Sequence, residues 1–337
     1  MKFATASTAA IAGCAAAVLA GCSGASHGTA ALPTSVASES RANPLRGVVL
    51  ATGVDTRFSG PASILSRLAH HHHRAKVEKD LFVSDEGSNV FELKNGTYNE
   101  AGDITSGVSG SDGVFVDKKG NVYVANVTGP TVTEYKKGHG SPICTYSSGL
   151  VDPINVTVDD SGNVFVADFN KLQDPGFVDE FGQCGKTIKK QFDVSSGPEG
   201  VAVDKSGDLF VSYFGAQGGN FEEFKAGSSS PTPLGISVTS PAGLILDKKS
   251  DLILDDQEGN LFVSAPPYTS LTTLASNLDD PFHCSLNQKE NLLFNANHGS
   301  GTVTVYSYPS GTLETTIDSS NGIDGAEGVG ESPDAIF

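Results

Sequence analysis

Apolar and polar residues alternate with a period of two in a phrase that recurs along most of the chain. Four clear copies and one looser copy read GVFVDKKGNVYVAN from Gly113, NVTVDDSGNVFVAD from Asn155, GVAVDKSGDLFVSY from Gly200, GLILDKKSDLILDD from Gly243 and HCSLNQKENLLFNA from His283. This alternation predicts β-strands, and the central Asp-x-x-Gly predicts a tight turn, because glycine accepts positive φ and aspartate caps backbone amides. Each copy therefore predicts a β-hairpin. We interpret its aspartates as turn residues rather than metal ligands: Asp117, Asp159, Asp204 and Asp247.

The spacing of these hairpins indicates a repeat architecture. Equivalent first-strand positions follow one another at intervals of 42, 45, 43, 40 and 45 residues: Val114, Val156, Val201, Leu244, Cys284 and Val329. Periods of about 40–50 residues built from strands are typical of propeller blades. A third strand follows the hairpins, as in TVTEYKKG from Thr131 and NFEEFKAG from Asn220, and a weaker outer strand comes after it. We therefore predict an all-β, six-bladed β-propeller with four-stranded antiparallel blades.

The first blade lacks one strand in sequence order. The repeats begin near Lys79 with DLFVSD and NVFELKNG, which match only the second and third strands, whereas the C-terminal GVGESPDAIF matches an inner strand. A propeller closed in this way has no open sheet edge at the junction of its ends. We expect residues 77–337 to form the propeller, closed by the C-terminal strand joining the first blade. Long amphipathic helices are missing from the sequence, which argues against TIM-barrel and Rossmann folds.

The N-terminus has the layout of an export signal. In MKFATASTAAIAGCAAAVLAGC, Lys2 precedes an Ala-rich apolar stretch that is too short to span a bilayer. Its end, Leu19-Ala20-Gly21-Cys22, resembles the lipobox of bacterial lipoproteins, in which the cysteine is lipidated and becomes the mature N-terminus. We expect a signal peptide over residues 1–21, lipidation of Cys22 and anchoring to the bacterial cell envelope, on its periplasmic side or at the cell surface. The alternative is an ordinary signal peptide with an accidental cysteine.

Residues 22–76 are rich in Ser, Ala, Gly and Thr and carry no strand alternation. This composition is typical of a flexible linker between the lipid and the folded domain. The run from His70 to His73 has two interpretations, metal capture by neighbouring imidazoles or a solvated stretch of linker, and we favour the second.

Charge and cysteine content narrow the class of partner. The formal net charge is -17, and residues 77–337 contain 15 Lys and no Arg against 37 acidic residues. A surface of this sign repels phosphate backbones, so we expect no nucleic-acid partner. Beyond the signal peptide and Cys22 the cysteines are Cys144, Cys184 and Cys284, an odd number. Cys144 and Cys184 lie about one repeat apart, so they either bridge adjacent blades or remain unpaired.

The phrase GVAVDKSGDLFVSY resembles the NHL-repeat family, and over residues 79–337 the chain is also similar to gluconolactonase-like and streptogramin-lyase-like six-bladed propellers. In such propellers the inner strand begins, and the second strand ends, at the top face beside the central channel. The resemblance places two columns of side chains there. Ahead of the inner-strand glycine, or beside its equivalent, the candidates are Asp112, Asn155, Glu199, His283 and Glu327. At the end of the second strand they are Asp85, Asn126, Asp168, Tyr213, Asp256 and Ala296.

Gluconolactonase-like enzymes hold a metal with acidic or Asn residues that precede an inner-strand glycine. By resemblance, Asp112, Glu199 and Glu327 are the candidate metal ligands, and Ca²⁺, which prefers oxygen ligands, is the one cofactor that they suggest. The remaining candidates for ligand binding are Asp85, Asn126, Asn155, Asp168, Tyr213, Asp256 and His283. Asn155 departs from the family pattern because Val156, not glycine, follows it. Streptogramin-lyase-like enzymes rely on several histidines around the channel, whereas only His283 lies at a comparable place here.

No Gly-rich phosphate loop, zinc-spaced cysteine set or nucleophile elbow occurs in the sequence, and we predict no catalytic residue. We expect a monomeric cell-envelope lipoprotein whose propeller is a binding module with an acidic top face. Its ligand would be a small molecule, a glycan or an envelope protein. The alternatives are a Ca²⁺-dependent lactonase or lyase and a structural spacer without a ligand.

Overall fold

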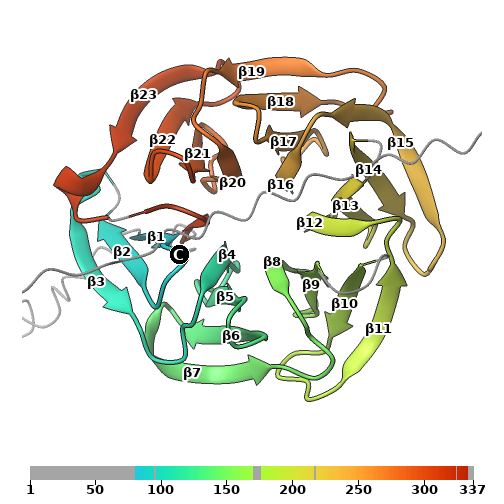
Figure 1. Cartoon of the computed structure of the whole chain (residues 1–337), viewed down its shortest axis with the longest axis horizontal. Helices are drawn as coiled ribbons and strands as arrows, with labels where there is room; N and C mark the ends of the chain where they lie inside the picture. Colours follow the sequence, from blue (N-terminus) through green and yellow to red (C-terminus); the bar gives the residue numbers. More distant parts are fainter. Residues whose placement is uncertain (1–79, 95, 170–175, 216–217, 324, 333–337) are drawn as a thin grey trace, which may run out of the picture. The chain divides into compact units, whose positions relative to one another are not determined.

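The computed structural model describes residues 80–94, 96–169, 176–215, 218–323 and 325–332. The predicted signal peptide, Cys22, the linker and His70 to His73 lie outside these residues. The described residues form six four-stranded sheets, arranged as a ring around a central channel (Figure 1). Their one helical segment is a 3₁₀ turn, η1 (Ser319–Asn321). The predicted six-bladed, all-β fold is therefore confirmed.

Each blade contains an inner, a second, a third and an outer strand, in that order from the channel outward. Blade 1 is β24 (Val329–Glu331), β1 (Asp80–Ser84), β2 (Val90–Lys94) and β3 (Glu100–Ile104). Blade 2 is β4 (Ser111–Val116), β5 (Val122–Asn126), β6 (Thr131–Lys136) and β7 (His139–Tyr146). Blade 3 is β8 (Pro153–Val158), β9 (Val164–Asp168), β10 (Phe177–Phe181) and β11 (Ile188–Asp193).

The other three blades repeat this order. Blade 4 is β12 (Gly197–Val203), β13 (Leu209–Gly215), β14 (Gly218–Phe224) and β15 (Pro231–Val238). Blade 5 is β16 (Pro241–Leu246), β17 (Leu252–Asp256), β18 (Asn260–Ser264) and β19 (Thr272–Ser276). Blade 6 is β20 (Pro281–Leu286), β21 (Leu292–Asn297), β22 (Thr302–Ser307) and β23 (Thr312–Ile317).

The turns between inner and second strands follow the predicted chemistry. In blade 2, the Asp117 carboxylate accepts hydrogen bonds from the backbone N–H groups of Lys119 and Asn121, both at 2.8 Å, and Gly120 has a φ of 82°. Asp159, Asp204 and Asp247 accept the same pair of backbone bonds in blades 3, 4 and 5. These aspartates therefore hold turns.

The recurring glycine at the start of the inner strand is required by the approach of the next blade. A Cβ atom on Gly113 would lie 2.7 Å from the backbone oxygen of Ile154, and one on Gly328 would lie 2.5 Å from that of Asp112. Backbone atoms cannot move aside as a flexible side chain can, so a larger residue at these two positions would push neighbouring blades apart.

The hydrophobic core is divided among the interfaces between neighbouring blades. Six clusters of buried residues lie there, each shared by two adjacent sheets. The cluster between blades 6 and 1 joins Leu81 and Val83 to Phe294 and Val305, together with Val329 from the closing strand. Both faces of each sheet are therefore buried, which explains the continuous apolar runs in the second strands.

The C-terminal strand closes the ring as predicted. β24 pairs antiparallel with β1, with Leu81 opposite Glu331 and Val83 opposite Val329. Just before it, the backbone N–H of Glu327 donates to the backbone oxygen of Ser84 at 2.9 Å. The last described strand of the chain thus completes the first blade (Figure 1).

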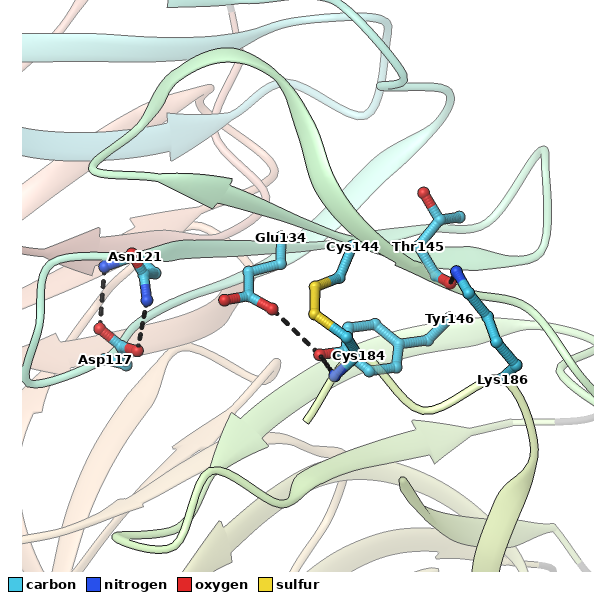
Figure 2. The surroundings of a disulfide bond; sticks show 8 residues. All are labelled: Asp117, Asn121, Glu134, Cys144, Thr145, Tyr146, Cys184 and Lys186. Atoms are coloured by element: carbon cyan, nitrogen blue, oxygen red, sulfur yellow. Dashed lines mark hydrogen bonds between the residues drawn. A yellow bond between two sulfur atoms is a disulfide. The ribbon is translucent and has the colours of Figure 1, made fainter. Parts of the chain in front are cut away.

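A disulfide joins blades 2 and 3 (Figure 2). It links Cys144 in β7 to Cys184 in the turn after β10, with the two Cα atoms 5.2 Å apart. Beside it, Glu134 is fully buried and accepts a hydrogen bond of 3.0 Å from the hydroxyl of Tyr146. Of the two possibilities that the sequence left open, the structure therefore shows the disulfide between adjacent blades. Cys284 is a free, buried cysteine. In the described part of the chain, no helix has the length and hydropathy needed to cross a membrane.

Candidate functional site

The candidate residues lie at the end of the ring where inner strands begin and second strands end, which we call the top face. The opposite end, with the Asp-x-x-Gly turns, is the turn face. At the position where four inner strands carry glycine, blades 3 and 6 carry Asn155 and His283. These two blades face each other across the ring (Figure 1). The two side chains should therefore meet near the channel axis.

Asn155 and His283 do meet. Asn155 Nδ2 lies 3.1 Å from His283 Nδ1, and His283 Nε2 lies 3.1 Å from Asp112 Oδ1. His283 is buried, with 3% of its surface exposed. Burial raises the pKa of Asp112, although its hydrogen bond to His283 acts in the opposite direction. We call Asp112, Asn155 and His283 the channel plug, because they join blades 2, 3 and 6 across the channel.

A second group lies where the ring closes, and we call it the mouth cluster. Glu86 follows β1, His298 follows β21 and Glu327 precedes β24, and one ligand atom from each lies within 4.8 Å of the other two. His298 Nδ1 contacts Glu327 Oε1. Burial, with Asp112 and Glu86 nearby, raises the pKa of Glu327 to about 7, although its hydrogen bond to His298 opposes this. Three segments that are distant in sequence thus form one polar cluster.

Two of the three predicted metal ligands each contact a histidine. Asp112 contacts His283 and Glu327 contacts His298. Glu199 is half-buried at the bulge of β12, in the blade opposite blade 1. The sequence therefore named the three carboxylates and His283 as candidates, but it did not predict that Asp112 contacts His283, and it did not include His298 and Glu86 in the site.

Most of the candidate residues at the ends of the second strands form hydrogen bonds that stabilise nearby loops. Asp85 accepts from the N–H of Gly87 at 2.8 Å, and Asp168 and Asp256 accept from the loops before their inner strands. Asn126 accepts from the N–H of Ser109 at 3.0 Å and donates to Thr133. Tyr213 is half-buried at the end of β13, opposite Pro198. In blade 6 the strand register places Asn297, not Ala296, in the second-strand column, because six residues separate the paired Leu286 and Leu293, whereas five separate the equivalent Val158 and Val164 of blade 3. These contacts are structural in character.

A cavity of about 330 Å³ occupies the channel below the plug. Its lining runs from Asn155 and His283 to the exposed turn residues Lys118, Lys205 and Lys248, so it opens at the turn face. Its walls include a level of aliphatic side chains: Val116, Val158, Val203, Leu246 and Leu286. The residues that the sequence suggested for ligand binding lie only at the top face, and this cavity was not predicted. Adjacent inner strands create it together, and no single repeat encodes it.

Charged residues are distributed unevenly between the two ends. Within the described ranges, every lysine lies in a turn-face loop or at the strand ends next to one: Lys94, Lys118, Lys119, Lys136, Lys137, Lys186, Lys189, Lys190, Lys205, Lys225, Lys248, Lys249 and Lys289. The top face carries carboxylates, among them Glu86 and Glu258 in loops, and Asp112 and Glu199 near the start of inner strands. The turn face carries carboxylates as well, among them Asp117, Asp159, Asp204 and Asp247, so the two ends differ chiefly in their lysines.

Asp255 is a buried acid beside the channel plug. It lies in β17 with no exposed surface, and neither of its carboxylate oxygens has an N–H or O–H donor within hydrogen-bond distance among the described residues. Burial raises its pKa to about 7, although nearby His283 and the Cys284 thiol act in the opposite direction. A buried carboxyl group without such donors favours its protonated form.

This pKa predicts a dependence of stability on pH. Because the folded state binds the Asp255 proton more tightly than the unfolded chain does, the free energy of unfolding should fall as pH rises from about 4 to 7. Asparagine does not titrate in this range. In Asp255→Asn, the difference in the free energy of unfolding between about pH 4 and pH 7, measured by urea unfolding at each pH, should therefore be about 1–3 kcal/mol smaller than in the wild type. The exposed turn-face variant Asp160→Asn serves as the control. If the free energy of unfolding of Asp255→Asn changed with pH as much as that of the wild type, the raised pKa of Asp255 would be contradicted.

Comparison with known proteins supports the fold. No family model and no curated protein matches the sequence. Among solved structures, the chain is similar to one in a nidogen/laminin complex, with 15% identity, a TM-score of 0.64 and coverage of 77% of this chain and 100% of that one. A protein from Desulfotomaculum acetoxidans aligns with 13% identity, a TM-score of 0.55 and coverage of 76% and 99%. Kuenenia stuttgartiensis hydrazine synthase aligns with 14% identity, a TM-score of 0.52 and coverage of 68% and 73%. At these identities the similarity establishes the propeller architecture alone.

Proposed function

We propose that the protein is a binding module of the bacterial cell envelope, tethered through lipid on Cys22, whose propeller binds a cationic partner at the top face. The observation that carries the proposal is the distribution of lysines: those of the described ranges lie toward the turn face, so the carboxylates around the plugged channel have no lysine near them at the top face. Phe282 packs on His283 with ring centroids 4.7 Å apart, and Phe214 at the end of β13 is 44% exposed. Aromatic side chains are enriched at the centres of protein interfaces.

Reversing one exposed charge on each face tests whether the partner binds at the top face. Glu258 is exposed in the top-face turn between β17 and β18, and Asp160 is exposed in a turn-face loop. The soluble chain, with Cys22 replaced by Ser, is screened against envelope proteins, glycans and cationic small molecules. For any ligand bound at low ionic strength, we expect Glu258→Lys to weaken binding about fivefold and Asp160→Lys to have little effect. Equal losses in the two variants, or a loss only in Asp160→Lys, would place binding elsewhere.

The alternative function makes a different prediction. A Ca²⁺-dependent lactonase with Asp112, Glu199 and Glu327 as ligands should hydrolyse lactones only when Ca²⁺ is present. Glu199→Gln should remove that activity, because it replaces a charged ligand by a neutral amide. Ca²⁺-dependent turnover by the wild-type protein would overturn the binding-module proposal in favour of the enzyme.

A further inference from the structure

We propose that the mouth cluster of Glu86, His298 and Glu327 is a binding site for a divalent transition-metal ion such as Zn²⁺. The site lies on the face to which binding is assigned above, but the inference concerns the metal alone and does not require a partner. It differs from the Ca²⁺ set suggested by the sequence, since two of its three ligands are new and one is an imidazole.

The donor set determines the class of metal. Two carboxylate oxygens and one imidazole nitrogen lie within 4.8 Å of one another, close enough for small side-chain rotations to bring them onto one ion. Ca²⁺ and Mg²⁺ prefer oxygen ligands alone, whereas imidazole suits Zn²⁺ and related metals. The side chain of His298 is 42% exposed, which leaves room for water or a ligand at a further coordination position.

Burial and charge give an independent reason for a cation here. Glu327 is only 6% exposed, and the carboxylates of Asp112 and Glu86 lie close enough to interact with it electrostatically. No lysine of the described ranges lies at this end of the ring. A dication would offset the repulsion among these carboxylates.

The fold holds the buried ligand in position before any ion arrives. The backbone N–H of Glu327 donates to the Ser84 oxygen, and the backbone N–H of Gly328 donates to Ser84 Oγ at 2.8 Å. Both contacts form only when β24 has joined β1. Metal binding should therefore be coupled to closure of the ring and should raise the melting temperature of the propeller.

The test is a thermal-shift titration with Zn²⁺ alone, using the full chain with Cys22 replaced by Ser. At about 100 times Kd, we expect a rise in Tm of roughly 5–10 °C. His298→Asn and Glu86→Gln, both at exposed positions, should abolish the rise. His139→Ala should retain it, because His139 is an exposed histidine near Glu92 and distant in the fold from the cluster. A variant with His70 to His73 replaced by Ala should also retain it, which separates the cluster from the histidine run.

Two outcomes overturn the inference: no rise in Tm with millimolar Zn²⁺, or an equal rise in wild type and His298→Asn. A rise with Ca²⁺ that Glu199→Gln removes would instead support the sequence-based site. Binding of a partner is measured separately through Glu258→Lys, so failure of the metal site and failure of the binding-module proposal are distinguishable. The Co²⁺ absorption spectrum, compared between wild type and His298→Asn, reports directly on nitrogen coordination.

Discussion

A chain that ends at Glu327 should lose its cooperative fold, whereas a chain that ends at Ser332 should melt with the full-length protein. The shorter chain lacks β24, so β1 loses its antiparallel partner and the cluster between blades 6 and 1 loses Val329. Burial of one Val contributes about 1.5–3 kcal/mol, and each lost hydrogen bond about 1 kcal/mol. The total of about 5 kcal/mol or more is comparable with the whole stability of a typical domain.

Thermal melting followed by circular dichroism, together with size-exclusion chromatography, measures this effect. The exposed edge of β1 should also promote association of the truncated chain. A synthetic peptide of residues 325–332 serves as the rescue control, because a strand that binds in trans should raise the melting temperature as its concentration increases. Equal melting temperatures for the chains ending at Glu327 and Ser332 would show that closure contributes little.

The architecture could be predicted from the sequence because the same short-range sequence features recur in most of the blades. Alternating apolar residues, an Asp-x-x-Gly turn and an inner-strand glycine recur in the blades, and each has a local physical cause. The turn needs a positive φ at Gly120, and the glycine at position 113 accommodates the backbone of the next blade. A repeat whose sequence has diverged can still be recognised from the other copies. The predicted number of blades and the predicted closing strand are therefore both confirmed.

The chemistry at the top face was predicted less well because it lies in departures from the repeat. Asn155 and His283 were recognised as candidates, but their meeting depends on blades 3 and 6 being opposite in the ring. Glu86 and His298 lie in loops, where the repeat pattern gives no register. One extra residue in the turn between β20 and β21 was enough to place Ala296 in a column that belongs to Asn297.

The burial of Asp255 could not be predicted from the sequence for a different reason. Its position in the second strand is occupied by Ser212 in blade 4, whose hydroxyl donates to the backbone oxygen of Ala242. A carboxylate cannot donate in this way unless it is protonated. The sequence revealed the alternation of β17, but the burial and the raised pKa of the acid follow from packing against blade 6.

Removing the disulfide should lower the free energy of unfolding by about 3–4 kcal/mol. Cys144 and Cys184 are separated by 40 residues, and the entropy of closing a loop of that length in the unfolded chain corresponds to about 4 kcal/mol at 25 °C. We expect Cys144→Ala with Cys184→Ala to shift the urea midpoint accordingly. Reduction of the wild-type protein should produce a similar shift.

The neighbouring Glu134 makes the choice of variant informative. One of its carboxylate oxygens is buried without a hydrogen-bond partner, while the other accepts from the Tyr146 hydroxyl. The sulfur atoms of Cys144 and Cys184 lie within 4.8 Å of a Glu134 carboxylate oxygen. If a serine hydroxyl at either position moves close enough to donate to this carboxylate, the double Ser variant should lose about 1 kcal/mol less than the double Ala variant. Reducing agent should affect neither variant. A double Ala variant with the urea midpoint of the oxidised wild type would contradict a stabilising bond between blades 2 and 3.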